Sequence, residues 1–300
     1  MSRDFAMSDQ ADAERVAECV WLIGAELGEG PVWVASERAV YFVDIKGLRI
    51  HRLAPETGLR TSWPTPAQTG FIVPARGGGL VCGLQGGLHR FDPGDGRFTR
   101  IRAVETNRPG NRINDGFVDS AGRLWFGTMD DGERENTGSL YRWSGQGDPI
   151  VQDSGYAITN GPAVSPDGRT LYHTDSAAKT IYAFDLAPSG AISGKRVFAR
   201  TDDSHPDGMA VDAAGALWVA LFGGWRIERY SPGGEVIGSI ALPCANVTKL
   251  AFGGDDLRTV YATTARLHVS PADRTAQPLA GGLFTFAVDT PGLPQAEFNL

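Results

Sequence analysis

The sequence predicts an all-β protein, a six-bladed β-propeller with a metal site in its central channel. Two observations lead to the blades. First, a short apolar run, a turn rich in Gly, Asp or Ser, and an alternating apolar run recur six times along the 300 residues. Second, the first apolar residue of the second run recurs at intervals of 40 to 47 residues, at Val40, Leu80, Leu124, Leu171, Leu217 and Val260. Repeats of about 40–45 residues with about four strands each are typical of propeller blades.

A third strand of shared character follows in each repeat. These segments alternate in period two and are rich in β-branched and aromatic residues, as strands are: "LRIHRLAP", "GGLHRFDP", "GSLYRW", "KTIYAFDL", "WRIERYSP" and "GGLFTFAVD". No long stretch has the 3.6-residue period of an amphipathic helix. The segment "AECVWLIG" precedes the first repeat and has no blade of its own. We therefore expect it to add the outermost strand to the last blade and close the ring.

Composition and charge narrow the class of protein. We expect residues 16–295 to form a single propeller domain after a flexible N-terminal tail, residues 1–15. The net charge of −7, without a block of Lys or Arg, argues against a nucleic-acid or anionic-membrane partner. No apolar run approaches the ~18 residues of a membrane span. Three scattered cysteines and an N-terminus without a signal-peptide core predict a cytoplasmic protein, which we expect to be a monomer or a small homo-oligomer.

Polar residues occupy the entry of the first strand in the repeats. They lie 10 to 14 residues before the second-strand marker, at Glu29, Thr69, Asn114, Asn160, Asp207 and Asn246. Asp and Asn are common at strand ends because they suit turns, and Asp-Gly is a frequent hairpin turn. A polar loop, not a strand, precedes Asp207, however, so no hairpin is needed there. Since the first strand of each blade lines the channel, we expect these side chains to converge on its axis.

Charge then predicts a bound cation. Glu29 and Asp207 would meet in a confined place with amides and no lysine among the ring positions. Buried carboxylates without a partner are costly, and a metal ion removes the conflict. Oxygen donors favour Ca²⁺, Mg²⁺ or Mn²⁺, whereas Zn²⁺ or Fe(II) would more usually bring His or Cys. Because about three protein ligands leave coordination positions open, the site is expected to be catalytic rather than structural.

Other polar residues allow two interpretations. Arg112 lies two residues before Asn114 and is either an ordinary surface charge or a substrate clamp. His205 either lines the pocket or is incidental, and His173, inside a strand, is expected to be packed. Three aspartates that follow the second strands in register are interpreted as structural residues that bond neighbouring loops: Asp44, Asp130 and Asp175.

At these residues the sequence resembles the senescence marker protein/regucalcin/gluconolactonase family, and within it the bacterial aldonolactonases of the xylonolactonase kind. The motifs that carry the resemblance are "LGEGPVW" (27–33), "NRINDGFVDSAGRLWFGTM" (111–129), "ITNGPAVSPDGRTLYHTDS" (158–176), "HPDGMAVDAAGALWVALFGG" (205–224) and "PCANVTKLAFGG" (243–254). One departure is Pro162, where many members have Leu.

The resemblance implies a six-bladed propeller that holds one divalent metal ion through Glu29, Asn160 and Asp207. It implies Arg112 and Asn114 as the substrate-binding pair. The implied reaction is hydrolysis of a sugar lactone, such as xylono-, arabinono- or gluconolactone, to the aldonic acid. Ca, Mn, Mg, Zn and Fe(II) all remain candidates for the ion.

The chemistry agrees with that reaction. A metal ion at the ring carbonyl would act as a Lewis acid, and Arg112 and Asn114 would orient hydroxyl groups. Either the ion or Asp207, as a catalytic general base, would activate the water. A metal-bound carboxylate is a weakened base, which favours the ion with Asp207 assisting. Two alternatives stay open: a non-catalytic calcium-binding regulatory propeller, and a related propeller esterase or organophosphate hydrolase.

Overall fold

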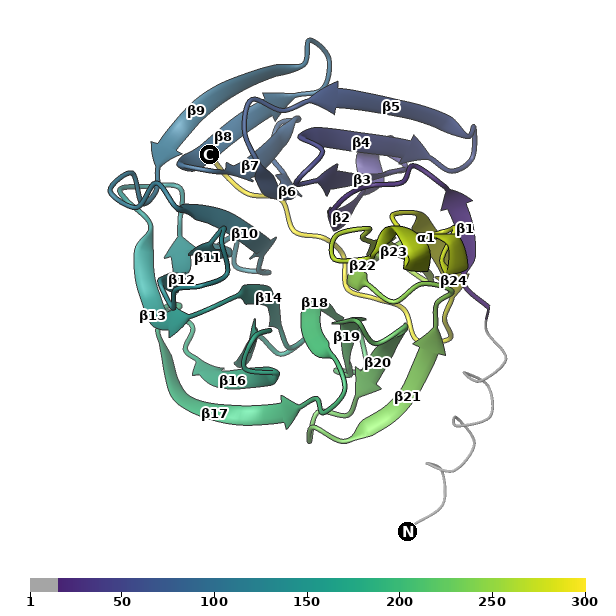
Figure 1. The fold of residues 1–300 in the computed structure, drawn as a ribbon. Helices are drawn as coiled ribbons and strands as arrows, with labels where there is room; N and C mark the ends of the chain where they lie inside the picture. The colour runs from purple at the N-terminus through teal and green to yellow at the C-terminus, as the bar shows by residue number, and fades with distance from the viewer. Residues whose placement is uncertain (1–15) are drawn as a thin grey trace.

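The computed structural model describes residues 16–300, whose strands form six four-stranded antiparallel sheets set around a central channel (Figure 1). The six-bladed propeller predicted from the repeat is therefore confirmed. The second strands begin within one residue of the predicted markers, for example β7 at Leu80 and β11 at Leu124. The expected N-terminal tail, residues 1–15, lies outside the described residues.

In each of the first five blades the strands run in sequence order from the channel outward. The first blade contains β2 (Gly28–Val34), β3 (Ala39–Asp44), β4 (Arg49–Ala54) and β5 (Leu59–Pro64). The second contains β6 (Thr69–Pro74), β7 (Leu80–Leu84), β8 (Gly87–Asp92) and β9 (Arg97–Ala103). The third contains β10 (Asn111–Val118), β11 (Leu124–Asp130), β12 (Gly138–Trp143) and β13 (Ile150–Tyr156). The fourth contains β14 (Thr159–Val164), β15 (Thr170–Asp175), β16 (Thr180–Leu186) and β17 (Ile192–Arg200). The fifth contains β18 (His205–Val211), β19 (Leu217–Phe222), β20 (Arg226–Tyr230) and β21 (Val236–Ala241).

The sixth blade joins the two ends of the chain. It contains β22 (Val247–Gly253), β23 (Thr259–Thr264), β24 (Leu283–Ala287) and, outermost, β1 (Glu18–Trp21). Strand β1 pairs with β24, with Glu18 opposite Thr285, as predicted from "AECVWLIG". This pairing closes the ring, because hydrogen bonds between the N-terminal strand and the last blade tie the two ends of the propeller together. The short helix α1 (Pro271–Ala276) lies between β23 and β24. Among residues 16–300, no helix has the length and apolar character needed to cross a bilayer.

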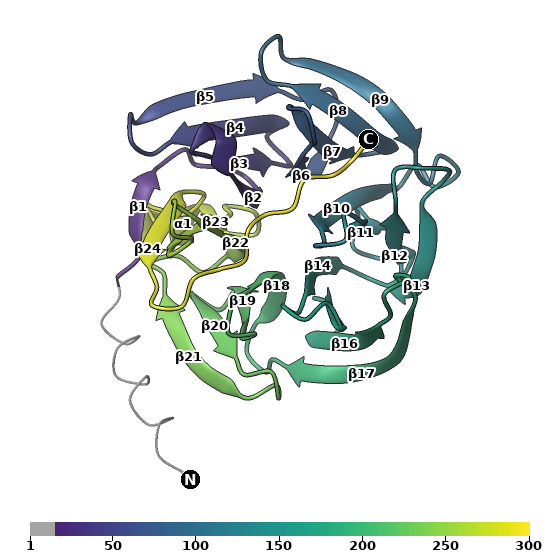
Figure 2. The same ribbon diagram turned by 180° about the vertical axis from the view of Figure 1, so that it is seen from behind.

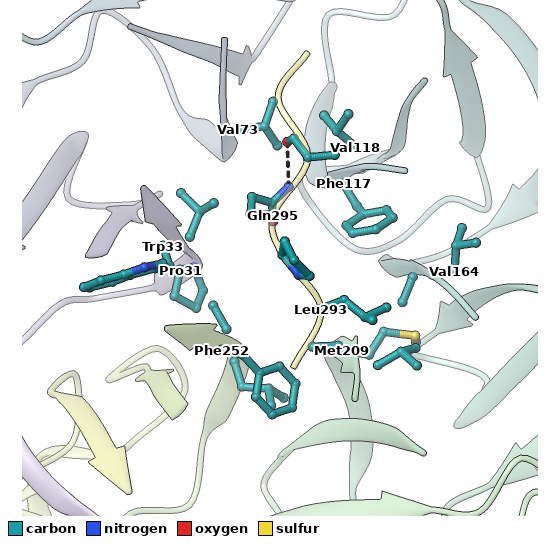
Figure 3. A pocket seen from close by; sticks show the side chains of 18 of the residues that line it. Pro31, Trp33, Val73, Phe117, Val118, Val164, Met209, Phe252, Leu293 and Gln295 are labelled. Atoms are coloured by element: carbon teal, nitrogen blue, oxygen red, sulfur yellow. Dashed lines mark hydrogen bonds between the residues drawn. The ribbon is translucent and has the colours of Figure 1, made fainter. Parts of the chain in front are cut away.

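After β24 the chain crosses the centre of the ring toward β7 and β8 (Figures 1 and 2). Two isolated bridges hold this C-terminal segment, residues 288–300: Gly292 pairs with Asp212, and Phe298 pairs with Ala75. Under it lies a cavity of about 400 Å³ with mostly apolar walls, and Leu293 of the segment points into it (Figure 3). This end of the channel is called the apolar cavity below.

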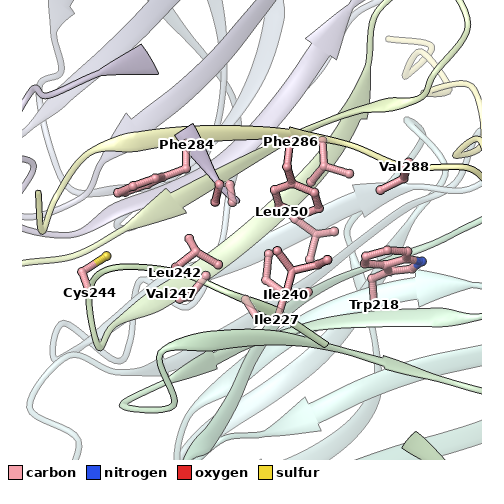
Figure 4. Packing of buried hydrophobic residues seen from close by; sticks show 14 of the residues in the cluster. Trp218, Ile227, Ile240, Leu242, Cys244, Val247, Leu250, Phe284, Phe286 and Val288 are labelled. Atoms are coloured by element: carbon pink, nitrogen blue, oxygen red, sulfur yellow. The ribbon is translucent and has the colours of Figure 1, made fainter. Parts of the chain in front are cut away.

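The apolar core lies between neighbouring blades, because each sheet packs its face against the next. Between the fifth and sixth blades, Ile227 and Ile240 face Leu250 and Phe286 (Figure 4). Burying such a side chain contributes roughly 1.5–3 kcal/mol. The buried indole N–H groups of the core find hydrogen-bond acceptors within their own blade. Trp218 donates its indole N–H to Asp212 Oδ2 at 3.0 Å, and the third blade repeats this bond, from Trp125 to Asp119, at 2.8 Å.

Candidate active site

The innermost strands lose their regular pairing at the predicted ring positions. In each of the six, the register shifts within two to three residues: Glu29/Val32, Thr69/Phe71, Ile113/Gly116, Asn160/Ala163, Pro206/Met209 and Val247/Lys249. Such irregularities bend a strand and re-aim its side chains. The glycines that follow two ring residues make this possible, since Gly30 (φ +53°) and Gly161 (φ +69°) have left-handed backbones.

The structure brings together all five residues assigned to the site from the sequence: Glu29, Arg112, Asn114, Asn160 and Asp207 line one cavity of about 160 Å³. The same cavity, called the polar cavity below, is completed by Leu27, Met129, Glu133, Ile158, Ser176, His205, Phe222, Leu267 and His268. Its size suits a ligand smaller than the drug-sized molecules that fill typical pockets of ~300–1,000 Å³.

Two of the six expected ring residues do not line the polar cavity. Thr69 donates its hydroxyl to Ala67 O at 3.2 Å, and Asn246 donates its amide to Leu267 O at 2.8 Å. In the sixth blade, Lys249 takes the ring position instead. It pairs with Thr263, three residues after the Val260 marker, as Glu29 pairs with Val43 and Asn160 with Thr174 in their blades. Its offset of 11 residues from the marker is the sequence signal that could have identified it in place of Asn246.

A chain of hydrogen bonds fixes the two asparagines. Asn114 donates to Asn160 Oδ1 at 2.7 Å and to Thr159 O at 2.6 Å. Asn160 in turn donates to Ser176 Oγ at 2.9 Å, and Ser176 donates to Pro206 O at 2.6 Å. The nitrogen of Asn160 is engaged by Ser176, whereas its carbonyl oxygen accepts one bond from Asn114 and keeps a second lone pair for a cation.

Arg112 is buried, which excludes the interpretation as an ordinary surface charge. Its Nε donates to Asp131 Oδ1 at 2.7 Å, and its Nη1 donates to Asn114 Oδ1. Asp131 also accepts from Lys46 at 2.6 Å and Gln68 at 2.9 Å. Burial opposes ionisation of Asp131, but these hydrogen bonds and the Arg112 charge hold its pKa below the ordinary value. Asp131 was missed from the sequence because its partners come from three different blades.

Glu29 and Asp207, the carboxylates at the centre of the polar cavity, have too few hydrogen bonds and positive charges around them to offset their burial. Burial, followed by the charge of Asp115, raises the pKa of Glu29 to about 7. Burial and the neighbouring Glu29 and Asp115 raise the pKa of Asp207 well above its usual range. The Oδ1 atom of Asp207 is buried without a hydrogen-bond partner. Such an atom costs free energy unless something in the functional state binds it.

Lys249 corrects the expectation that no lysine enters this region. Its Nζ donates to Asp115 Oδ1, and both side chains are nearly completely buried. Burial raises the pKa of Asp115, and the Lys249 charge partly offsets that rise. The ion pair compensates Asp115 but leaves Glu29 and Asp207 without a cation of their own.

These donors fit a hard divalent cation. Within residues 16–300, no metal site can be built from three His, Cys, Asp or Glu side chains alone. The candidate set instead combines two carboxylates, Glu29 and Asp207, with the amide oxygen of Asn160. All are oxygen donors of the kind that Ca²⁺, Mg²⁺ and Mn²⁺ take. The unpaired Asp207 Oδ1 supplies an independent reason for a cation.

The histidines divide as the two interpretations allowed. His205 lines the polar cavity, with its Nδ1 2.9 Å from Ser176 O, and His268 was not anticipated there. His173 is packed inside its strand, where burial lowers its pKa to about 3. The three register aspartates bond loop backbones as expected, for example Asp44 with the N–H of Leu27 at 3.0 Å.

Comparison with known proteins decides the family. The profile described as the SMP-30/Gluconolactonase/LRE-like region matches residues 27–266. The chain belongs to this family. It is 35% identical over 284 residues to a 6-deoxy-6-sulfogluconolactonase of Pseudomonas putida, covering 94% of this chain and 98% of that protein. It is 36% identical over 280 residues to an L-arabinolactonase of Azospirillum brasilense, covering 91% and 92%.

Solved structures agree with this membership. A calcium-binding protein, regucalcin, from Agrobacterium tumefaciens superposes with a TM-score of 0.92 at 26% identity, covering 95% of this chain and 98% of that one. The family predicted from the motifs is thereby confirmed, together with its propeller fold.

Proposed function

We propose that this member of the sugar lactonase family hydrolyses a sugar lactone to its aldonic acid with the help of one divalent metal ion. The observation that carries the proposal is the polar cavity itself. Two undercompensated carboxylates, Glu29 and Asp207, share it with Arg112, a buried cation held by two hydrogen bonds. The two relatives described above are lactonases by name, which supports the reaction class.

Glu29, Asn160 and Asp207 would hold the ion. When bound, it would polarise the lactone carbonyl as a Lewis acid and favour attack by water. The protein side chains then have separate tasks. Arg112 and Asn114 position the substrate hydroxyl groups, because Arg112 uses only two of its five N–H donors in the bonds described. Asp207 removes a proton from the attacking water and returns it to the ring oxygen as the acyl C–O bond breaks, which completes the ester cleavage.

Charge favours a neutral lactone over an anionic one. Arg112 is the one arginine or lysine among the described residues that line the polar cavity, and it is paired with Asp131, which Lys46 also contacts. Glu133 also lines the cavity. Apart from the ion itself, a substrate with a sulfonate group would find no lysine or arginine here that lacks a carboxylate partner. We therefore propose neutral pentono- and hexonolactones, with xylono-, arabinono- and gluconolactone first.

The test is a lactone panel. Metal-free protein, prepared with EDTA, is assayed by acid release on xylono-, arabinono-, glucono- and galactonolactone and on a 6-sulfo analogue. Spontaneous hydrolysis is subtracted, and each divalent ion is then added back singly. We expect turnover of neutral lactones only with metal. Full turnover by the metal-free protein, or none on any lactone with any ion, would overturn the proposal.

A variant separates the enzyme from a calcium-binding propeller without catalysis. Arg112→Lys keeps the positive charge but loses the planar fork that bonds Asp131 and Asn114 together. We expect kcat/KM to fall about ten- to hundredfold, by analogy with the loss of an orienting hydrogen bond. Calcium affinity, measured by titration calorimetry, should stay within about threefold. An unchanged kcat/KM would argue for the non-catalytic alternative.

A further inference from the structure

The Asp115–Lys249 ion pair lies between the two cavities of the channel. Asn114 lines the polar cavity, while Gly116, two residues on in β10, lines the apolar one together with Lys249. Lys249 reaches the pair from β22 and donates its Nζ to Asp115 Oδ1. The pair is therefore placed directly behind the carboxylates proposed to hold the metal ion.

The chain makes room for this lysine. At Gly208, which follows Asp207, a Cβ atom would lie 2.4 Å from Lys249 Cγ. Any side chain there would push against the lysine stem, so Gly208 permits the stem to pass. This answers why Asp-Gly stands at 207–208 without a hairpin. The glycine serves the approach of Lys249 rather than a turn.

Three carboxylates and one ammonium group meet in this part of the channel. The carboxylates of Glu29, Asp115 and Asp207 are all buried, as is Lys249. Outside this group, Arg112 and Lys46 share the single carboxylate of Asp131, so these neighbours add positive charge and supply no further negative charge for a trivalent ion. With every carboxylate ionised, the group carries two negative charges. A divalent cation would make it neutral, whereas a trivalent cation would leave one uncompensated positive charge in a buried place.

We propose that Lys249, acting through Asp115, sets the valence that the channel accepts and makes the site selective for divalent over trivalent cations. This inference rests on the metal site of the proposed function and adds to it a residue that touches neither the ion nor the substrate. Lys249 is thus a positioning and charge-setting residue. Its ammonium group also holds Asp115 Oδ1, to which the N–H of Gly116 donates at 2.7 Å, whereas Asp115 Oδ2 is buried without a hydrogen-bond partner.

The consequence of removing the lysine follows from Coulomb's law. In Lys249→Met the stem volume is kept, the positive charge is lost, and the carboxylate group carries three negative charges. A unit charge several ångströms away, at the effective dielectric of a protein site, changes the binding of a trivalent ion more than that of a divalent one by about tenfold or more. Asp115→Asn changes the charge in the opposite direction and should weaken both ions.

The experiment measures binding rather than activity. Ca²⁺ and La³⁺ are titrated by calorimetry, at one pH and ionic strength, into metal-free wild type, Lys249→Met, Asp115→Asn and the double variant. We expect the La³⁺/Ca²⁺ affinity ratio to rise at least tenfold in Lys249→Met. In Asp115→Asn, Ca²⁺ affinity should fall at least tenfold. In the double variant, which restores the net charge, the ratio should return to within about threefold of wild type.

A matched control is available on the outer strands. Lys195 donates to Asp153 at 2.6 Å, an ion pair of the same residue types far from the channel axis. Lys195→Met should leave the ratio within about threefold, which excludes an effect of total charge. An unchanged ratio in Lys249→Met overturns the inference while the metal site stands. If wild type binds no divalent ion at all, the proposed function fails as well. If Lys249→Met does not fold, the double variant provides the test. A La³⁺/Ca²⁺ affinity ratio that differs from that of wild type by tenfold or more in the double variant would contradict the role of charge.

Discussion

Four inner strands, β2, β10, β14 and β18, line both the polar and the apolar cavity, yet the two cavities differ in the charged groups that they contain. Glu29 lines the polar cavity, and Pro31, two residues further along β2, lines the apolar one. Asp207 and Met209 divide in the same way on β18. The apolar cavity is the larger, about 400 Å³ against about 160 Å³. Size alone would therefore point to the wrong end of the channel.

The two ends of the channel have opposite effects on the stability of the fold. Apolar walls such as Leu293 and Phe252 stabilise the fold by leaving water, and the C-terminal segment adds to them at that end. The carboxylates at the other end oppose folding, because burial raises the pKa of both Glu29 and Asp207. A site that is unfavourable until a ligand arrives is typical of function rather than of structure.

The largest expected effect comes from removing one charge at the polar end. In Asp207→Asn the shape is kept, but an undercompensated carboxylate and a proposed metal ligand are lost. We expect turnover to fall about 10³-fold or more, and calcium affinity to fall with it. Because Asp207 Oδ1 has no hydrogen-bond partner, the metal-free variant should unfold at a temperature no lower than wild type.

The matched variant lies two residues further along the same strand. Met209→Leu replaces one apolar side chain of the apolar cavity by another of similar volume, so turnover should stay within about twofold. Turnover and metal affinity are measured side by side for the two variants. If both variants lost turnover and metal affinity to the same extent, the channel would not be divided into a catalytic end and a structural end.

The sequence predicted the fold and the four ring residues of the polar cavity, because both depend on a repeat that can be counted. Glu29, Asn160 and Asp207 are 131 and 47 residues apart in succession, yet their common offset from the strand markers placed them together. Asp131 and Lys249 were missed for a physical reason. Asp131 is held by Lys46, Gln68 and Arg112, which are far apart in the sequence. The repeat offset marks the position of Lys249, but no local pattern encodes its ion pair with Asp115 of another blade.

The C-terminal segment could not be predicted for the same reason. Its residues have no strand-like alternation, and two isolated bridges, at Gly292 and Phe298, fix it across the ring. At Gly292 a Cβ atom would lie 2.1 Å from Phe252 Cγ, so a glycine is required where the segment passes that ring. Only the assembled propeller presents the surface against which the segment lies.

The second effect concerns pH and is expected only at the polar end. In the metal-free protein, burial raises the pKa of Glu29 to about 7 and raises that of Asp207. Protons and the cation compete for these carboxylates, so calcium affinity should fall at least tenfold between pH 8 and pH 5.5. The stability that protonation lends to the metal-free fold is complete below the ordinary pKa of a glutamate and is lost as pH rises through about 7.

Thermal unfolding with EDTA or with saturating Ca²⁺, from pH 5.5 to 8.5, checks this sign. The rise in Tm caused by calcium should grow with pH. In Glu29→Gln, which cannot titrate, the growth should be smaller. A calcium-induced rise that is the same at every pH, in wild type, would mean that the carboxylates are already ionised and compensated without the cation.

The smallest effect on turnover is expected at the apolar end, although the effect on stability there is large. Phe298 is fully buried, and its ring lies 5.1 Å from that of Trp143. Its backbone N–H donates to Pro74 O at 2.8 Å, so it fixes the C-terminal segment to the second blade. Phe298→Ala should lower the free energy of unfolding by about 3–5 kcal/mol, measured by urea denaturation. The kcat/KM of the folded protein should stay within about twofold, because no wall of the polar cavity comes from this segment.

If instead turnover fell tenfold while the protein remained folded, the C-terminal segment would have to act on the polar cavity through the Asp115–Lys249 ion pair. The polar and apolar cavities would then be coupled, and the apolar end would contribute to catalysis as well as to stability.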